Sequence, residues 1–234
     1  MEHKPLAVIS GGTGYLGAAI VAELANAGWR TITLSRSTSA DTDTVYKCDV
    51  TDEKEVRATI SKIISMHGPV AACIHAASPA LERVPILSTS VASFDAAMDT
   101  GARAAFLLAK EVVGHMQKNA AFIGITTQAI EPGTPQPSGA YIPAKYALRG
   151  FLRVLSAETK EKGLRVYAIS PHFLPGGLND DLPQPIQDFL AHKSGTSSGS
   201  SKEIATLVRM LCAGEEKFPS GSSISFPSRA ANPL

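Results

Sequence analysis

Cysteine is scarce in this chain of 234 residues, which contains only Cys48, Cys73 and Cys212. The number is odd and no pair has the CxxC spacing of metal-binding or redox motifs. This argues against a disulfide framework, and we expect three reduced thiols in the core of a cytoplasmic protein. The six histidines show no metal-ligand spacing either, so no metal site is predicted.

The chain also lacks an excess of either charge and any long hydrophobic run. Its 22 basic and 21 acidic residues are scattered and give a formal net charge of +1. This balance predicts no nucleic-acid partner. The apolar run after MEHKPL is too brief for a signal peptide or a membrane span, so we expect no membrane association. A chain of this length can bury a full core as one domain, residues 1–234.

What the sequence does contain is a regular alternation of two patterns. Short apolar runs, typical of buried parallel strands, occur at Leu6–Ile9, Thr31–Leu34, Val70–Ile74, Ala121–Ile125 and Val166–Ile169. Helix-like segments lie between or after them at Leu16–Ala27, Glu53–Met66, Phe94–Gln117, Tyr141–Lys162 and Lys202–Cys212. The alternation predicts an α/β fold, a doubly wound parallel sheet with helices on both faces.

Two stretches do not fit this alternation. Residues 175–201 are rich in Pro, Gly and Ser and are interpreted as a flexible flap beside a site, with a plain surface loop as the alternative. The tail, residues 227–234, is expected either to be disordered or to pack on a partner subunit.

Glycines cluster where the first strand meets the first helix. Gly11, Gly14 and Gly17 are spaced three apart, which allows a tight turn, close approach of backbone N–H groups to a pyrophosphate, and close helix–strand packing. The ligand's negative charge would then lie at the positive end of the helix. The predicted dinucleotide-binding residues here are Gly11, Thr13, Gly14, Tyr15, Leu16 and Gly17.

The second strand ends in Ser35, Arg36 and Ser37. An acidic residue at such a position would bind ribose hydroxyls and favour NAD. The arginine and hydroxyls can instead bind a 2′-phosphate through charge-assisted hydrogen bonds, so NADP(H) is the predicted cofactor. The alternative is that Arg36 is a solvated loop charge.

Tyr141 and Lys145 are four residues apart, on one face of a helix. Pro143 is tolerable only in a first turn, which places the pair at the helix N-terminus. A nearby ammonium lowers the pKa of a phenol and makes it a better proton donor or acceptor near neutrality. Thr127 lies fourteen residues upstream of Tyr141, at the end of an apolar strand.

Taken in order, these pieces resemble the short-chain dehydrogenase/reductase family over nearly the whole chain. The match includes the glycine turn, Cys48-Asp49-Val50 after the third strand, His75-Ala76-Ala77 after the fourth, and Ser170-Pro171 after the sixth. The resemblance implies a Rossmann fold with strand order 3-2-1-4-5-6-7. It further implies that Asp49 and Val50 lie at the adenine, that His75, Ala76 and Ala77 line the adenosine ribose, and that Pro171 belongs to the cofactor site.

The resemblance also assigns catalytic roles. Tyr141 would be the general acid in carbonyl reduction, and Thr127 would orient the substrate oxygen. Lys145 would hold the nicotinamide ribose and lower the pKa of Tyr141. Hydride would pass directly from the nicotinamide, so the protein supplies geometry and a proton. Strict spacing would select Gln128 in place of Thr127, but a one-residue insertion in the 132–139 loop is the easier account. Thr126 is a further possible substitute for Thr127.

Four departures from the family pattern stand out. The glycine spacing and His75-Ala76-Ala77 resemble the extended branch that modifies sugar nucleotides, yet the chain lacks room for that branch's substrate domain. A threonine replaces the usual serine. Gly101 stands where many members have an asparagine that supports a water-linked proton path through the lysine. His172 replaces a glycine after Pro171, and Gly176 stands near a usual threonine. His75 and His172 are expected to hydrogen-bond nearby backbone.

The predicted function is hydride transfer between NADP(H) and a small carbonyl or alcohol substrate. The alternatives are a 3-oxoacyl or sugar-type biosynthetic reductase, or a catalytically silent NADP(H)-binding sensor. An intact Thr127, Tyr141 and Lys145 set argues against the sensor, because pure binding needs no tyrosine with a perturbed pKa. By resemblance, and from surplus apolar residues in 94–117 and 141–162, we expect a homodimer or homotetramer.

Overall fold

The computed structural model describes residues 4–131, 137–193, 200–216 and 218–234. One sheet runs through the described part in the order β3-β2-β1-β4-β5-β6-β7-β8. Its strands are β1 (Leu6–Ser10), β2 (Arg30–Ser35), β3 (Val45–Lys47), β4 (Val70–His75), β5 (Met116–Ile125), β6 (Arg165–Pro171), β7 (Ser222–Phe226) and β8 (Ala231–Pro233). All neighbours pair in parallel except β7 and β8. The predicted order 3-2-1-4-5-6-7 is confirmed, with β8 added at the edge.

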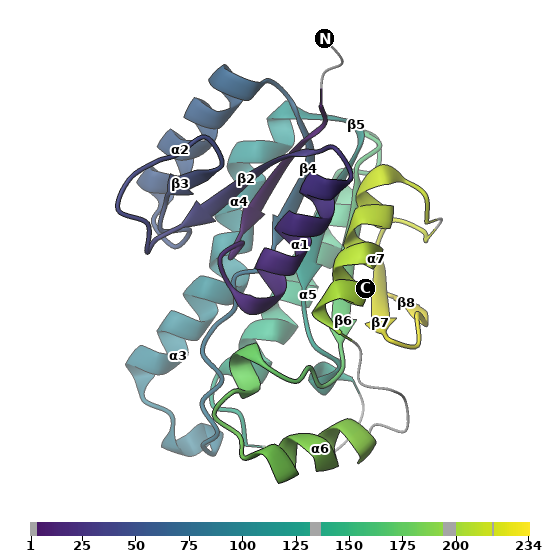
Figure 1. Cartoon of the computed structure of the whole chain (residues 1–234). Coiled ribbons are helices and arrows are strands. Elements are labelled where there is room, and N and C mark those ends of the chain that lie inside the picture. The colour runs from purple at the N-terminus through teal and green to yellow at the C-terminus, as the bar shows by residue number, and fades with distance from the viewer. Residues whose placement is uncertain (1–3, 132–136, 194–199, 217) are drawn as a thin grey trace.

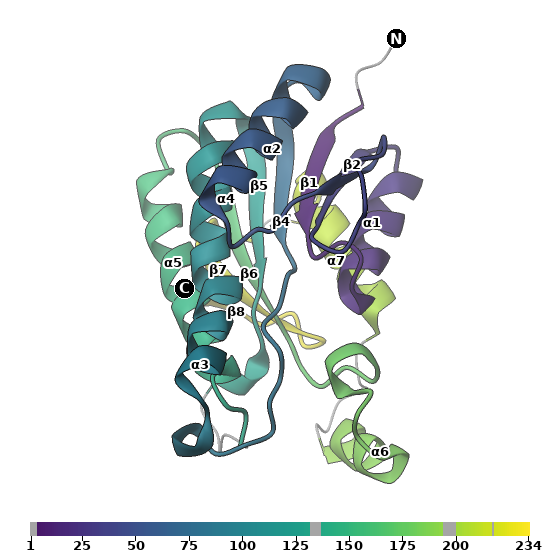
Figure 2. The same cartoon turned by 90° about the vertical axis from the view of Figure 1, so that its left-hand side faces the viewer.

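Helices cover both faces of the sheet (Figures 1 and 2). They are α1 (Tyr15–Asn26), α2 (Glu53–His67), α3 (Val91–Met98), α4 (Ala104–Val112), α5 (Tyr141–Glu158), α6 (Gln184–Lys193) and α7 (Ser201–Ala213). Because successive strand residues point to opposite faces, Val8 packs with α2, α4 and α5, while Ala7 and Ile9 pack with α1 and α7. Both faces of the central strands are therefore buried, as their uniformly apolar runs predict.

The helix predicted over Phe94–Gln117 is wrong in two respects. A π-helical turn at Asp99–Arg103 divides it into α3 and α4, and β5 already begins at Met116. Gly101 lies in that turn, where an added Cβ would stand 3.1 Å from the Cβ of Ala144 on α5. The turn thus brings the backbone of one helix close to the other, and a π-turn also frees a backbone carbonyl for other partners.

Parts of the predicted flap and of the tail form regular secondary structure. Within the predicted flap 175–201 the chain forms a short 3₁₀ turn, Gly177–Asn179, and the helix α6; residues 194–199 lie outside the described residues. The tail neither remains irregular throughout nor requires a partner subunit, because Ala231–Pro233 pair antiparallel with β7 of the same chain.

Among the described helices, none is long and apolar enough to cross a membrane.

Candidate active site

A cavity of about 1010 Å³ opens at the carboxyl ends of the strands. It is lined by the turns after β1, β2, β3, β4 and β5, by the start of α5, and by the segment after β6. The predicted site residues that line it are Gly11, Thr13, Gly14, Tyr15, Leu16, Gly17, Ser35, Arg36, Ser37, Asp49, Val50, Ala76, Ala77, Thr127, Tyr141, Lys145 and Pro171. Of the predicted set, His75 alone does not line the cavity.

The glycine turn after β1 is packed too closely for larger residues. A Cβ on Gly17 would stand 2.0 Å from the carbonyl oxygen of Gly11, and one on Gly11 would stand 2.5 Å from the backbone nitrogen of Ala77. Gly11 also has a φ of 73°, in the left-handed region that favours glycine. Glycine at these positions lets α1 begin directly at the cavity.

The N-terminus of α1 differs from those of two other helices. Asp52 caps α2 by accepting hydrogen bonds from the backbone of Lys54 and Glu55, and Ser200 and Glu203 form a capping box on α7. Within the described residues, no side chain caps α1, and its first turn contains no acidic residue. The free N–H groups and the positive end of the helix dipole are therefore available to an anion in the cavity.

Arg36 lies at the end of the cavity beside the turn after β3. Its side chain is exposed and makes no ion pair or hydrogen bond with any residue that the structure describes. The neighbouring Ser35 and Ser37 hydroxyls lie 3.1 Å apart. Burial raises the pKa of Asp49, but hydrogen bonds from Thr51 and the charge of Arg36 together keep that pKa below its ordinary value. This end of the cavity thus combines a free cation, two hydroxyls and an ionised carboxylate.

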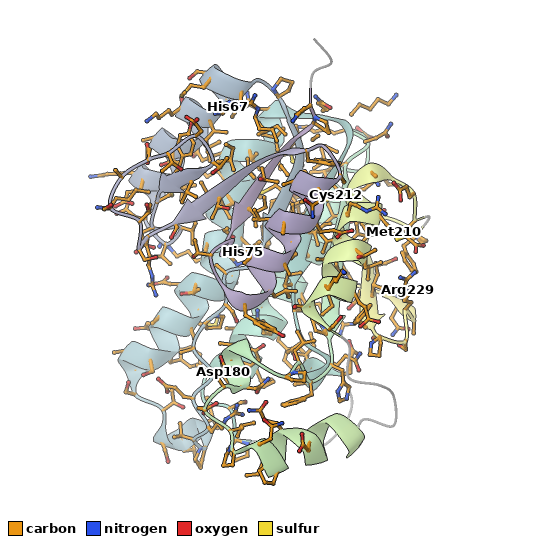
Figure 3. The ribbon with its side chains drawn as sticks, in the orientation of Figure 1. His67, His75, Asp180, Met210, Cys212 and Arg229 are labelled. Atoms are coloured by element: carbon orange, nitrogen blue, oxygen red, sulfur yellow. The ribbon has the colours of Figure 1, made fainter. Side chains whose placement is uncertain are left out.

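His75, labelled in Figure 3, is fully buried and does not line the cavity. Its Nε2 is 3.1 Å from the carbonyl oxygen of Thr100 and 3.0 Å from that of Gly101. Because carbonyl oxygens only accept, Nε2 must carry the proton, and the Ser10 hydroxyl then donates to Nδ1 at 2.8 Å. Burial, followed by the charge of Lys145, lowers the pKa of His75 to about 4, so the ring is neutral. His75 therefore bonds backbone, as expected, and joins β1 and β4 to the π-turn.

The structure distinguishes the three candidate side chains at the end of β5, Thr126, Thr127 and Gln128. Thr126 is buried and hydrogen-bonds the Ile169 carbonyl at 3.1 Å and the Ser170 hydroxyl at 2.7 Å. Gln128 donates its amide to the Phe226 carbonyl at 2.7 Å. The Thr127 oxygen accepts only a 3.2 Å hydrogen bond from the Ala129 backbone and acts on the neighbouring Tyr141. Of the three residues, Thr127 is the one whose side chain acts on Tyr141.

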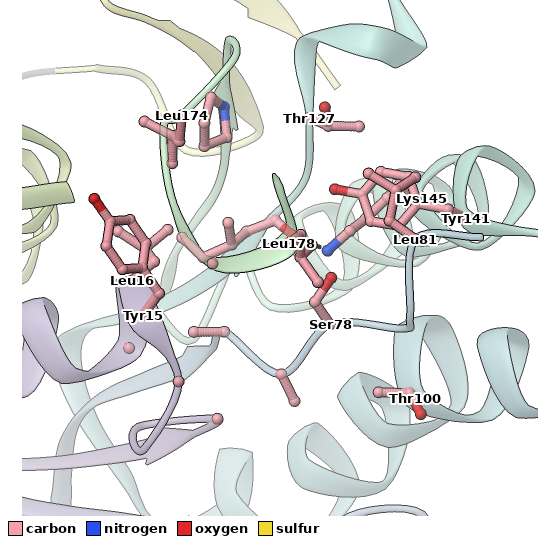
Figure 4. Close-up of a pocket in the computed structure, with 18 of the residues that line it drawn as sticks. Tyr15, Leu16, Ser78, Leu81, Thr100, Thr127, Tyr141, Lys145, Leu174 and Leu178 are labelled. Carbon is pink, nitrogen blue, oxygen red and sulfur yellow. Dashed lines mark hydrogen bonds between the residues drawn. The ribbon is translucent and has the colours of Figure 1, made fainter. Parts of the chain in front are cut away.

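Tyr141 and Lys145 lie in the first turns of α5, which begins at Tyr141 as Pro143 predicts. Figure 4 shows them with Thr127 on one side of the pocket, opposite Tyr15 and Leu16. The Lys145 ammonium donates a 2.8 Å hydrogen bond to the Ile125 carbonyl and lies 5.5 Å from the centre of the Tyr141 ring. The Lys145 side chain is buried, and this burial lowers the pKa of its amine to about 7.

That Lys145 lowers the pKa of Tyr141 stays a prediction, because the groups that shift this pKa in the structure are others. Burial raises the pKa of the Tyr141 phenol above its ordinary value, while the hydroxyls of Thr127 and Ser78 act in the opposite direction. The reason is that both side chains lie in the same poorly solvated region, which disfavours phenolate and ammonium alike. In this arrangement Tyr141 is protonated at neutral pH, the form that a proton donor needs.

The segment after β6 also lines the cavity. His172 accepts a 2.7 Å hydrogen bond at Nδ1 from the Phe173 backbone, so it satisfies local backbone as expected. An added Cβ on Gly176 would stand 3.0 Å from the Tyr15 ring, which shows that the segment packs on the start of α1. Arg83 ties the same segment to the loop after β4, with 3.2 Å contacts to both Asp181 oxygens.

The sequence did not single out several residues that line the cavity: Ser78, Leu81, Arg83, Thr100, Ile142, Leu174 and Leu178. Most of these are apolar or come from the loop after β4, which shows no periodic pattern. A signal was present for Ser78, because it follows the 75–77 turn at the carboxyl end of a central strand, where parallel sheets bind ligands.

The lowered pKa of Lys145 predicts a pH dependence of stability. Below pH 7 the lysine is protonated in both states, whereas between about 7 and 10.5 only the unfolded chain keeps the proton. The free energy of unfolding should therefore rise with pH in this window, by at most about 1.4 kcal/mol per pH unit. Urea unfolding from pH 7 to 8.5 should show this slope in the parent and not in Lys145→Met. Parallel profiles for the two proteins would contradict the assignment.

Comparison with known proteins places this geometry in a family. A family model described as "Enoyl-(Acyl carrier protein) reductase" matches residues 15–226. The 2-dehydro-3-deoxy-D-gluconate 5-dehydrogenase of Formosa agariphila is 26% identical, over 92% of this chain and 88% of its own. The 2-dehydro-3-deoxy-L-rhamnonate dehydrogenase (NAD(+)) of a Sphingomonas species is also 26% identical, over 93% and 91%.

A solved structure supports the same fold. A blue fluorescent protein from a metagenomic library, in complex with NADPH, has a TM-score of 0.84 to this chain at 20% identity, and the match covers 96% of this chain and 97% of that one. The family model spans most of the chain, and the sheet order is the one that the resemblance implies. The protein therefore belongs to the short-chain dehydrogenase/reductase family of oxidoreductases.

Proposed function

We propose that the protein is an NADP(H)-dependent carbonyl reductase or alcohol dehydrogenase. The observation that carries the proposal is the arrangement of Thr127, Tyr141 and Lys145 at one end of a cavity whose other end presents Arg36. The uncapped N-terminus of α1 lies between these two ends, beside the glycine turn. A carbonyl group and an extended cofactor that carries a pyrophosphate and a 2′-phosphate would together use all of these features.

The residues present fit a nicotinamide dinucleotide. The free N–H groups of α1 would hold the pyrophosphate, and Asp49 with Val50 would lie at the adenine. Ala76 and Ala77 would line the adenosine ribose. Pro171 and Lys145 would lie at the nicotinamide end, where the lysine can reach ribose hydroxyls. A cavity volume of about 1010 Å³ leaves room for a small substrate as well.

Arg36 supports NADP(H) over NAD(H). Its guanidinium has no partner among the described residues, so a 2′-phosphate would give it one, with the Ser35 and Ser37 hydroxyls as further donors. The names of similar proteins do not decide the question, because the Sphingomonas relative is named with NAD(+) and the metagenomic structure contains NADPH. The cofactor preference of this chain therefore depends on its own residues.

The chemistry expected of the protein is positioning and proton donation. The bound cofactor supplies or accepts the hydride. The Thr127 hydroxyl orients the substrate oxygen, and Tyr141, whose pKa is raised by burial, holds the proton that this oxygen receives. Lys145 keeps a positive charge close to the phenol when it is protonated, which stabilises the phenolate left after proton transfer.

After it donates its proton, Tyr141 must be reprotonated. In many family members an asparagine supports a water-linked proton path through the lysine for this step, and in this chain Gly101 stands in its place. Gly101 has no side chain to offer, and its carbonyl accepts from His75. The Lys145 ammonium is hydrogen-bonded to the Ile125 carbonyl. We propose that the proton returns through the cavity itself, past the Thr127 hydroxyl.

The experiment that tests the proposed function is NADPH oxidation, followed at 340 nm, over a panel of aldehydes, ketones, 2,3-hexanedione and 3-oxoacyl thioesters. The parent should reduce at least one member, and Tyr141→Phe should lose at least a hundredfold in kcat because it has no proton to give. NADPH affinity should be the same in both proteins. If both bind NADPH tightly and neither reduces any panel member, the silent-sensor alternative is favoured.

The cofactor preference has a separate test. Removing the guanidinium in Arg36→Ala should weaken NADPH binding by about 10- to 100-fold, the value of one or two charge-assisted hydrogen bonds, with NADH binding unchanged. Fluorescence titration with each cofactor measures the ratio. Lys160→Ala removes the same charge from an exposed position after α5 and serves as the control. An unchanged ratio in Arg36→Ala would show that the arginine is only a solvated charge.

We also propose that the protein assembles through the outer face of α4 and α5, in a dimer or tetramer. Phe106 on α4 and Tyr146 and Val154 on α5 are about half exposed, although they are large and apolar or aromatic. Light scattering at micromolar concentration should give at least twice the mass of 24.5 kDa, and Val154→Glu should lower it. A parent protein that remains monomeric would contradict this proposal.

The expected cytoplasmic location stays a prediction from the sequence.

A further inference from the structure

Ser78 has a buried hydroxyl that makes no hydrogen bond. It follows the turn after β4 and lines the cavity, and its Oγ is the one buried side-chain oxygen or nitrogen in the described part of the chain without a partner. Folded proteins retain few such groups, because a buried hydroxyl that gives up water and gains no partner is unfavourable. An unpartnered donor that faces a cavity indicates that a ligand atom completes its hydrogen bonding.

The neighbours of Ser78 identify which ligand atom this is. In Figure 4 its hydroxyl points toward the Lys145 nitrogen, on the side of the pocket where Tyr141 also lies. It is close enough to the Tyr141 phenol to lower the pKa of that group, although the contact does not have the geometry of a hydrogen bond. Thr127 acts on the same phenol from the end of β5. Three hydroxyls from three different segments therefore converge on one point of the cavity.

Other buried hydroxyls near this point are already occupied. Thr126 is bonded to Ser170, and Ser10 donates to His75. Ser78 is thus distinguished by an unused donor as well as by its position. Its action on the Tyr141 phenol, the proton donor of the proposed reaction, favours an oxygen of the substrate over an atom of the cofactor.

We propose that the Ser78 hydroxyl donates a hydrogen bond to the carbonyl oxygen of the substrate, beside Tyr141 and Thr127. This inference rests on the proposed function. In the reduction the carbonyl carbon gains a hydride, the π electrons move to the oxygen, and Tyr141 gives that oxygen its proton. Ser78 keeps its own proton throughout and stabilises the negative charge that develops on the oxygen. The substrate is therefore a compound whose carbonyl oxygen is accessible to three donors at once, such as an unhindered ketone or aldehyde.

The test compares Ser78→Ala and Ser78→Cys with the parent. Cysteine keeps nearly the size of serine but is a poor donor, so it separates loss of the hydrogen bond from loss of packing. With 2,3-hexanedione, or the panel carbonyl that the parent reduces fastest, both variants should lose at least tenfold in kcat, since a single donor to a developing oxyanion contributes on that order or more. The Kd for NADPH, from nicotinamide fluorescence, should stay within twofold. Ser156→Ala, at a serine bonded to Ser220 and remote from the cavity, should behave as the parent.

A second readout is the pH profile. Because the Ser78 hydroxyl lowers the pKa of Tyr141, its removal should move the apparent pKa of kcat/KM upward. Unchanged kcat and pH profile in both Ser78 variants, with Tyr141→Phe inactive, would overturn the role of Ser78 and leave the proposed function intact. Weaker NADPH binding with unchanged kcat would also overturn it, because Ser78 would then hold the cofactor. Turnover that survives in Tyr141→Phe would contradict the proposed function itself.

Discussion

Parallel pairing of β1, β4, β5 and β6 is the constraint on which the rest of the structure depends. Because these strands run in the same direction, their carboxyl ends meet at one edge of the sheet. The glycine turn, the turn at Ala76 and Ala77, Thr127 and Pro171 are far apart in sequence and come together there. The same constraint directs α1 and α5 so that the N-terminus of each begins at the cavity.

The two ends of the cavity differ in their physical character. Around Arg36 an exposed guanidinium lies near the ionised carboxylate of Asp49, which suits a ligand with several charges. Around Tyr141 burial disfavours every ionised form, since it raises the pKa of the phenol and lowers that of Lys145. A charge that develops in that second region has few water molecules to stabilise it. In the proposed mechanism, fixed donors would stabilise it, namely the hydroxyls of Thr127 and Ser78.

Much of the fold could be predicted because its signals are local and repeated. Strands that are buried on both faces must be apolar, and the tight turn before α1 requires glycine. The sequence therefore locates β1, β2, β4 and β6 to within two residues at each end. The π-turn at Asp99–Arg103 could not be predicted, because it depends on Gly101 packing against Ala144 and on His75 bonding freed carbonyls, both long-range contacts. Strand β8 was missed for the same reason, since it is stabilised by pairing with β7.

The site shows the same division. Residues tied to a turn or a helix start, such as Gly17 and Tyr141, could be located from spacing. Ser78 and Arg83 could not, because a loop without periodicity gives no indication of which side chains face inward. The direction of the Tyr141 pKa was also beyond the sequence, because it depends on how completely the phenol and Lys145 are buried together.

The most direct test of this account is a crystal structure of the protein grown with NADP(H). The account predicts the pyrophosphate at the N-terminus of α1, the 2′-phosphate on Arg36, and the nicotinamide ring within reach of Tyr141 and Lys145. A dinucleotide bound elsewhere, or bound in this cavity with its nicotinamide away from Tyr141, would contradict the assignment of this cavity as the active site.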